Sequence, residues 1–154
     1  MIPVLSLASF NEDRQGFAAT LGETCRNTGF FLLKDHGIPS DLISDAFAQA
    51  KAFFDQPQGV KESLAIHRIG NNRGYAGLGT ERLDEHSDLS DRKEAFNIGL
   101  DLSPQDPRIL AGEPFRGLNA WPDLPLFRET FLDYFDAVWA LGVTVHQPLA
   151  VDLG

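Results

Sequence analysis

Residues 29–39 read GFFLLKDHGIP, and this stretch decides the fold class of the chain. Residues 30–33 are four large apolar residues in a row, with Gly29 before them and Pro39 closing the stretch. A short apolar run bounded by Gly and Pro is typical of a strand that is buried on both faces. Pro39 suits the first position of a helix, because its missing N–H leaves no hydrogen bond unmade there. We therefore predict a buried strand, a tight turn and then a helix.

The segment before this strand predicts a short strand over residues 2–7 and then a helix. Ser9 or Asn11 can cap that helix, since both side chains accept hydrogen bonds from free backbone N–H groups. Cys25 falls on its apolar face, with no neighbouring histidine to activate the thiol, so we expect a core residue rather than a nucleophile. The apolar positions recur at helical spacing: Phe17, Ala18, Leu21 and Cys25.

The rest of the chain predicts two more amphipathic helices around an irregular middle. The first helix follows residue 39 and stops before Pro57, and a strand is expected over residues 93–100. Residues 101–123 are rich in proline and predict a long irregular connection. A long helix begins near Pro125, and we expect Pro148 to kink or end it. The apolar face of the first helix carries Leu42, Ile43, Ala46, Phe47, Ala50, Phe53 and Phe54.

Composition excludes several classes of partner. The 154 residues fit one domain or part of a larger one, and the formal net charge is −9. Residues 78–154 carry 14 acidic and 6 basic residues, a net charge of −8. Nucleic acid and anionic membrane surfaces would be repelled by this charge. A single cysteine permits no internal disulfide, which favours the reducing cytoplasm.

Taken in order, these segments resemble one protein family. The motifs are IPVLSL, GFFLLKDHGIP, RGYAGLG, DRKEAFNIGLD and GLNAWP, followed by a long helix. Their order is similar to the N-terminal region of the isopenicillin N synthase-like non-haem iron(II)- and 2-oxoglutarate-dependent dioxygenases. The resemblance covers nearly all of residues 2–154.

The resemblance implies an α+β fold in which this chain is the helical N-terminal support. Its few strands would complete a double-stranded β-helix, or jelly roll, whose main part is expected beyond residue 154. In the family a His-x-Asp pair, a distant second His and an Arg-x-Ser hold Fe(II) and 2-oxoglutarate in that later part. We therefore expect residues 1–154 to be the front part of an oxygenase that hydroxylates, desaturates or cyclises a small molecule. This segment alone is expected to be inactive and to bind neither cofactor.

Three residues are candidates for substrate contact, because the matching family segments border the active-site mouth. Arg73 can pair with a substrate carboxylate through a two-pronged hydrogen bond. Tyr75 and Phe96 can form an apolar wall with one polar group. Glu81, after the glycine-rich loop, is a weaker candidate. The alternative is that Arg73 pairs with a nearby acid and both aromatic residues are core.

One set of residues has the spacing of an iron site within the chain. His86 and Asp88 form a His-x-Asp, and His146 follows later, so these residues are the alternative metal ligands. We favour a solvated charged segment instead, because the pair lies in a run of six acids, Asp88 among them, mixed with three bases, and no Arg-x-Ser follows. His36 is expected to orient the turn before a helix, and His67 to lie at the surface.

A different class of function is a stand-alone, non-catalytic helical module or a remnant. An independent module should not leave strands without neighbours, whereas residues 3–7 and 29–35 read as strands with open edges. We therefore expect the missing jelly roll to cover these edges. Without it, we expect the chain to be marginally stable or to associate with itself.

Overall fold

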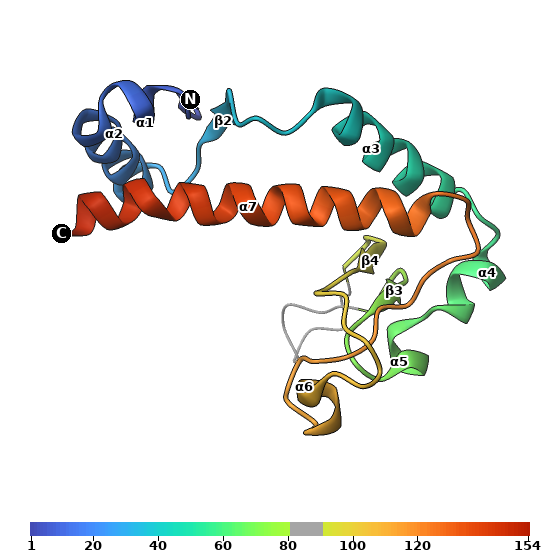
Figure 1. Ribbon diagram of the computed structural model, residues 1–154. Helices are drawn as coiled ribbons and strands as arrows, with labels where there is room; N and C mark the ends of the chain where they lie inside the picture. Colours follow the sequence, from blue (N-terminus) through green and yellow to red (C-terminus); the bar gives the residue numbers. More distant parts are fainter. Residues whose placement is uncertain (81–90) are drawn as a thin grey trace. The chain divides into compact units, whose positions relative to one another are not determined.

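The computed structural model describes residues 1–80 and 91–154, and helices dominate the described chain. As predicted, the architecture is helix-rich with a few short strands, which form two separate two-stranded sheets within the described residues (Figure 1). The chain divides into two compact units. Unit 1 comprises Met1–Ser44 and Asp133–Gly154, and unit 2 comprises Asp45–Leu132.

Unit 1 is built on a parallel strand pair joined by helices. Strand β1 (Val4–Ser6) pairs with β2 (Leu32–Lys34), and the helices α1 (Ser9–Glu12) and α2 (Arg14–Asn27) connect them. The predicted face of α2 is confirmed, since Phe17, Ala18 and Leu21 are buried and Cys25 packs against them. The unit 1 core consists of Leu5, Phe10, Phe17 and Leu21, with Leu7, Cys25, Phe31, Leu33 and Leu149 packed around it.

The stretch 29–39 forms a shorter and less buried strand than predicted. Phe31 and Leu33 pack into the core, whereas Phe30 is 71% exposed and Leu32 is 57% exposed. Burial on both faces was therefore a wrong prediction for this chain, because successive side chains of a strand point to opposite faces and only one face is covered here.

The turn after β2 uses His36 as expected. The backbone N–H of Ile38 donates to Nδ1 of His36 at 3.1 Å, which fixes the turn ahead of helix α3 (Ser40–Phe54). Helix α3 begins one residue after Pro39, whose carbonyl accepts a hydrogen bond from the Ile43 N–H at 3.2 Å. Pro39 therefore precedes the helix instead of taking its first position.

Helix α2 is capped by a residue other than the two predicted. The side chain of Asp13 accepts a hydrogen bond from the Gly16 N–H at 2.9 Å. Ser9 is the first residue of α1, and Asn11 lies within that short helix. The prediction of Ser9 or Asn11 failed because α1 and α2 are separate helices, with extended backbone only at Asp13 between them.

Unit 2 carries the second core and the remaining strands. Helices α4 (Gln58–Ser63) and α5 (Ile66–Ile69) lead to strand β3 (Gly74–Ala76), which pairs antiparallel with β4 (Ala95–Asn97). On α3, Ala46 and Phe53 are buried as predicted, but Phe47 is 73% exposed. The unit 2 core consists of Phe53, Tyr75 and Phe127, with Phe54, Leu64, Phe96, Ile98, Trp121, Leu124 and Phe131 packed around it.

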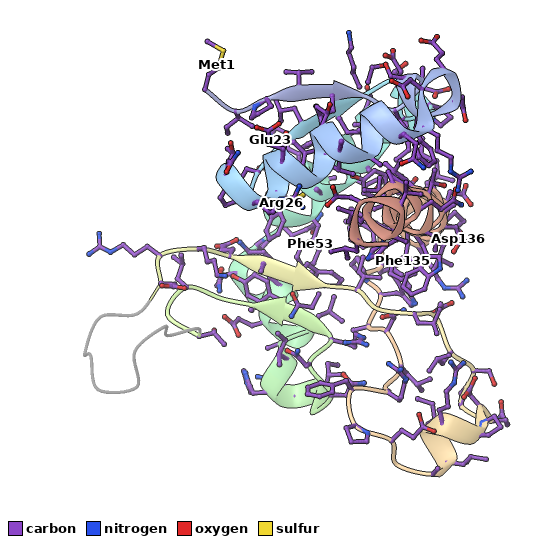
Figure 2. All side chains as sticks on the ribbon, turned by 90° about the vertical axis from the view of Figure 1, so that its left-hand side faces the viewer. Met1, Glu23, Arg26, Phe53, Phe135 and Asp136 are labelled. Carbon is purple, nitrogen blue, oxygen red and sulfur yellow. The ribbon has the colours of Figure 1, made fainter. Side chains whose placement is uncertain are left out.

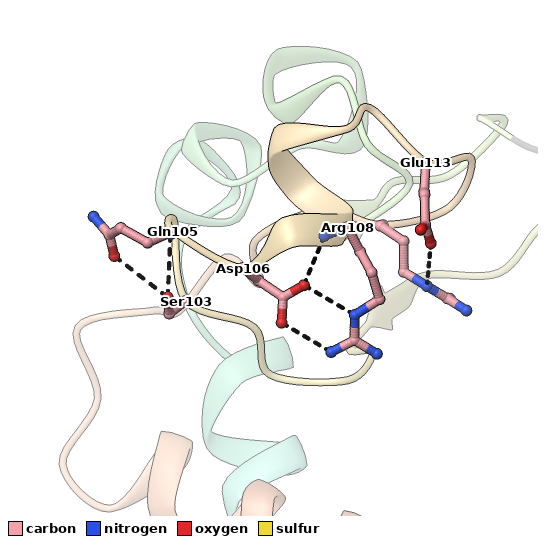
Figure 3. Close-up of polar contacts among 6 residues, drawn as sticks. Ser103, Gln105, Asp106, Arg108 and Glu113 are labelled. Atoms are coloured by element: carbon pink, nitrogen blue, oxygen red, sulfur yellow. Dashed lines mark hydrogen bonds and ion pairs between the residues drawn. The ribbon is translucent and has the colours of Figure 1, made fainter.

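The connection over residues 101–123 is irregular, as predicted, apart from helix α6 (Pro107–Leu110). Asp106 caps α6 and holds the guanidinium of Arg108 through two hydrogen bonds of 2.9 Å (Figure 3). These bonds lower the pKa of the Asp106 carboxyl to about 2. Arg116 pairs with Glu113 at 3.9 Å. Local ion pairs thus order a segment that has little core of its own.

Helix α7 (Phe127–Leu153) is the long helix predicted from Pro125. Pro148 lies inside it, with its ring fully buried, and does not end it. Gly154, after the last residue of the helix, has a φ of 91°. In unit 1, Arg26, labelled in Figure 2, pairs with Asp152 near this end at 2.5 Å. Among the described residues, no helix is both long and apolar enough to cross a membrane.

Candidate functional site

The hairpin of β3 and β4 brings two of the three predicted substrate residues together. Tyr75 lies directly opposite Phe96 in the antiparallel register, so both side chains lie on one face of the pair. On this face the Phe53 ring lies 4.5 Å from the Phe96 ring and 6.1 Å from the Tyr75 ring. Tyr75 is 1% exposed, and Phe96 is half-buried. In this chain, both aromatic residues belong to the core of unit 2.

The Tyr75 hydroxyl has a partner inside the unit. It accepts a hydrogen bond from Nε2 of Gln58 at 3.3 Å, and the same amide donates to Glu62 at 2.7 Å. The Nζ of Lys61 lies 5.5 Å from the centre of the Tyr75 ring. The polar group of Tyr75 is therefore held by α4, which fixes the ring against the hairpin.

Lys61 is a buried cation at the base of the hairpin, 6% exposed as a residue. Its ammonium donates to the Phe54 carbonyl at 3.2 Å and to the two carboxylate oxygens of Glu94 at 3.1 and 2.8 Å. The hydrogen bond to Glu94 raises the pKa of Lys61, and burial opposes this shift. The pair ties α4 to the residue that precedes β4. Sequence reasoning did not find Lys61, because nothing local distinguishes it from a surface lysine.

Arg73 stands just before β3 and is anchored by backbone carbonyls. Its guanidinium donates to the carbonyls of Asn72 at 3.3 Å and Phe115 at 3.1 Å. It also packs on Gly99, where an added Cβ would overlap the guanidinium. Among the described residues, no carboxylate pairs with Arg73, and its Nε is buried without a hydrogen-bond partner. Arg73 thus links Gly99, which follows β4, to Phe115 in the connection over residues 101–123.

The GLNAWP motif explains how the end of β4 is completed. The side chain of Asn119 accepts a hydrogen bond from the Gly99 N–H at 2.8 Å and donates to the Gly99 carbonyl at 2.9 Å. The Asn119 side chain therefore makes the two hydrogen bonds that a neighbouring strand would otherwise make with the backbone of Gly99. Asp101 bonds both Asn119, at 3.1 Å, and Arg128, at 2.6 Å, and Arg128 lies over the Trp121 ring. These residues line an open cavity of about 470 Å³ together with Leu102, Ser103, Pro104 and Leu118.

The described histidines do not come together as a metal site. His67 is exposed, and His36 is occupied in its turn. Nδ1 of His146 lies 2.7 Å from the Gly142 carbonyl of its own helix. His86 and Asp88, the other alternative ligands, lie outside the described residues, as does Glu81. Within residues 1–80 and 91–154, no group of three His, Cys, Asp or Glu side chains could hold a metal ion, so this part does not fit a 2-His-1-carboxylate iron site.

Comparisons with known proteins agree with this arrangement. Residues 2–124 match the family model described as the N-terminal region of the non-haem dioxygenase in morphine synthesis. The 2-oxoglutarate-dependent dioxygenase caaD of Aspergillus niger is 32% identical over 161 residues, which cover 99% of this chain and 48% of that protein. The chain spans about half the length of the relatives it matches.

Solved structures show the same fold over the whole chain. A 2OG-Fe(II) oxygenase family protein from Caulobacter crescentus superposes with a TM-score of 0.80 at 28% identity, covering 99% of this chain and 48% of that one. A Neurospora crassa protein, solved in complex with alpha-KG and thymine, gives a TM-score of 0.78 at 26% identity, with coverages of 99% and 48%. The chain therefore belongs to the family of non-haem dioxygenase N-terminal regions, as the order of its motifs predicted.

Proposed function

We propose that this chain is the N-terminal part of an Fe(II)- and 2-oxoglutarate-dependent oxygenase that oxidises a small organic molecule. The observation that carries the proposal is the extent of the match, since nearly the whole chain corresponds to only half of each 2-oxoglutarate-dependent relative. The Neurospora crassa protein that shares the fold was solved with a small heterocyclic compound, thymine. The corresponding substrate of this chain is accordingly a small molecule.

In this proposal the chain supplies support and one wall, and not the iron ligands. The described residues do not fit an iron site, so three ligands would have to come from another part of the protein. Bound Fe(II) with 2-oxoglutarate would supply the oxidising power in the complete enzyme. The 154-residue segment by itself is proposed to bind neither group and to be inactive.

The substrate residues proposed are Arg73, Tyr75 and Phe96. The hydrogen bonds to the Asn72 and Phe115 carbonyls use two of the five N–H donors of Arg73, so Arg73 can pair with a substrate carboxylate while it keeps both carbonyl partners. Tyr75 is buried and would support the wall from behind. Phe96 is half-buried and lines a small cavity, so its ring is the more accessible of the two.

The partner proposed for unit 1 is the jelly roll of the complete enzyme. The outward face of the β1–β2 pair is apolar and uncovered, with Val4 58% exposed opposite Leu32 at 57%, and Phe30 at 71%. A parallel sheet that is apolar on both faces is typical of a sheet buried on both sides. In a chain that lacks the jelly roll, the same face and the open strand edges would promote self-association.

An anaerobic Fe(II) titration of the 154-residue chain tests whether the iron ligands lie inside or outside this chain. The proposal expects no stoichiometric binding by the chain, because it assigns the iron ligands to the part of the enzyme beyond residue 154. Stoichiometric binding that the substitution His86→Ala abolishes would place the iron site inside this chain and overturn the proposal. The coding sequence past Gly154 gives a second test, since a His-x-Asp, a later His and an Arg-x-Ser are expected there.

A further inference from the structure

An apolar cavity of about 140 Å³ lies beside the aromatic core of unit 2. Its walls come from three elements of that unit, namely the C-terminal half of α3, strand β4 with the residue that follows it, and the first turns of α7. Every described lining side chain is apolar, and five of the seven are phenylalanine. The lining consists of Ala50, Phe53, Phe54, Phe96, Ile98, Phe127 and Phe131.

The rings around the cavity form one edge-to-face pair and one tilted pair. Phe53 and Phe96 lie 4.5 Å apart with an interplanar angle of 63°, and Phe127 and Phe131 lie 4.6 Å apart at 50°. Phe53 and Phe127 are fully buried at the back of the cluster, whereas Phe96 and Phe131 are only half-buried. The cavity thus has a fixed aromatic back wall and two rings with free surface.

We infer that this cavity binds a small neutral aromatic compound. The volume of about 140 Å³ is close to that of a cavity that accepts benzene, so a single aromatic ring fits. Water would find no hydrogen-bond partner among the lining side chains, and a charged ligand would lose its hydration without compensation. Aromatic walls favour an aromatic guest, because offset and edge-to-face contacts add to the area buried. The inference rests on the proposed role of Phe96 in substrate contact and names the class of compound, while the binding itself requires neither iron nor 2-oxoglutarate.

Benzene is the probe, and the methyl-labelled 154-residue chain is the target. We expect saturable benzene binding, with nuclear Overhauser effects from benzene protons to the methyl groups of Ala50 and Ile98. Benzoate has the same ring and a carboxylate, and it should give no such contacts. Benzene should also raise the melting temperature of the chain in a concentration-dependent way, because it binds the folded state.

Two cavity-filling substitutions and one matched control complete the test. Ala50→Leu fills the cavity from α3 and should abolish benzene binding, whereas Ala52→Leu adds the same group to an exposed site of the same helix and should leave it unchanged. Ile98→Phe fills the cavity from the other wall and gives an independent loss if the first variant does not fold.

Several results would overturn the inference. They are the absence of saturable benzene binding, equal binding of benzoate, and retention of benzene contacts in a folded Ala50→Leu variant. Contacts from the Ala50 and Ile98 methyl groups to protons of a second copy of the chain would also overturn it, because the cavity would then be filled by protein.

Discussion

The buried pair of Lys61 and Glu94 offers the most direct test of how the candidate site is held. The substitution Lys61→Met keeps the length of the side chain and removes its charge. Glu94 then loses its cation, and the Phe54 carbonyl loses a donor. Removal of one partner from a buried ion pair costs about 3–5 kcal/mol. The Glu94 side chain is 24% exposed, so water can partly hydrate the carboxylate that has lost its partner. We therefore expect a loss of unfolding free energy at the lower end of this range, about 3 kcal/mol.

The assay for this prediction is urea unfolding followed by tryptophan fluorescence, with Trp121 reporting beside the Phe127 ring. Lys51→Met is the matched control, because Lys51 pairs with Asp55 on α3 while both side chains are largely exposed, 75% and 63%. Exposed pairs of this kind contribute less than about 1 kcal/mol. The reasoning is refuted if Lys61→Met destabilises the chain no more than Lys51→Met does.

The pH dependence of the same pair follows from the raised pKa of Lys61. A base whose pKa is higher in the folded state contributes stability in full below its ordinary value of 10.5. That contribution is lost as the pH rises through the folded value. The stability difference between the wild-type chain and Lys61→Met should therefore be constant from neutral pH to near 10 and shrink above 10.5. A difference that grows with pH would contradict the assignment.

Three further predictions concern packing, backbone and charge. Phe53→Ala should cost about 3–5 kcal/mol of unfolding free energy, because Phe53 is 0% exposed, while Phe47→Ala, at 73% exposure, should cost under about 0.5 kcal/mol in the same urea assay. Gly74→Ala should lower the melting temperature more than Gly29→Ala. Both glycines have positive φ, but only at Gly74 would the added Cβ meet backbone, so equal effects would contradict this. An NMR titration of the Asp106 carboxyl should have its midpoint near pH 2. The ion pair with Arg108 therefore contributes stability above pH 3.8, and this contribution is lost as the pH falls toward 2. A midpoint near 3.8 would contradict the paired geometry.

The sequence predicted the elements whose signal is local. Periodic apolar residues located α2, α3 and α7, and the run before Pro39 located β2. Burial of that run was predicted wrongly, because the sequence cannot show whether a second layer covers the outer face. The prediction that Phe47 belongs to the packed face of α3 was wrong for the same reason. Phe47 fits the apolar spacing of the helix, but its side chain is exposed in the described structure. Pro148 does not end α7, so that half of its prediction was wrong, and a kink there stays a prediction.

The candidate site was less accessible to sequence reasoning, because its contacts join distant segments. Lys61 and Glu94 are 33 residues apart and meet only once the hairpin packs on α4. Asn119 was noticed as part of a motif, but its pairing with Gly99 depends on the path of the 101–123 connection. Arg73 was named as a candidate for substrate contact, which stays a prediction, and its carbonyl partners could not be anticipated.

The central claim is that this chain is the supporting half of an Fe(II)- and 2-oxoglutarate-dependent oxygenase. The most direct measurement is an anaerobic calorimetric titration of 2-oxoglutarate into the complete product of the natural gene, with and without Fe(II), beside the 154-residue chain. The account predicts stoichiometric, Fe(II)-dependent binding by the complete product and none by the 154-residue chain. Stoichiometric binding by the 154-residue chain, or no binding by a folded, Fe(II)-supplied complete product, would contradict it.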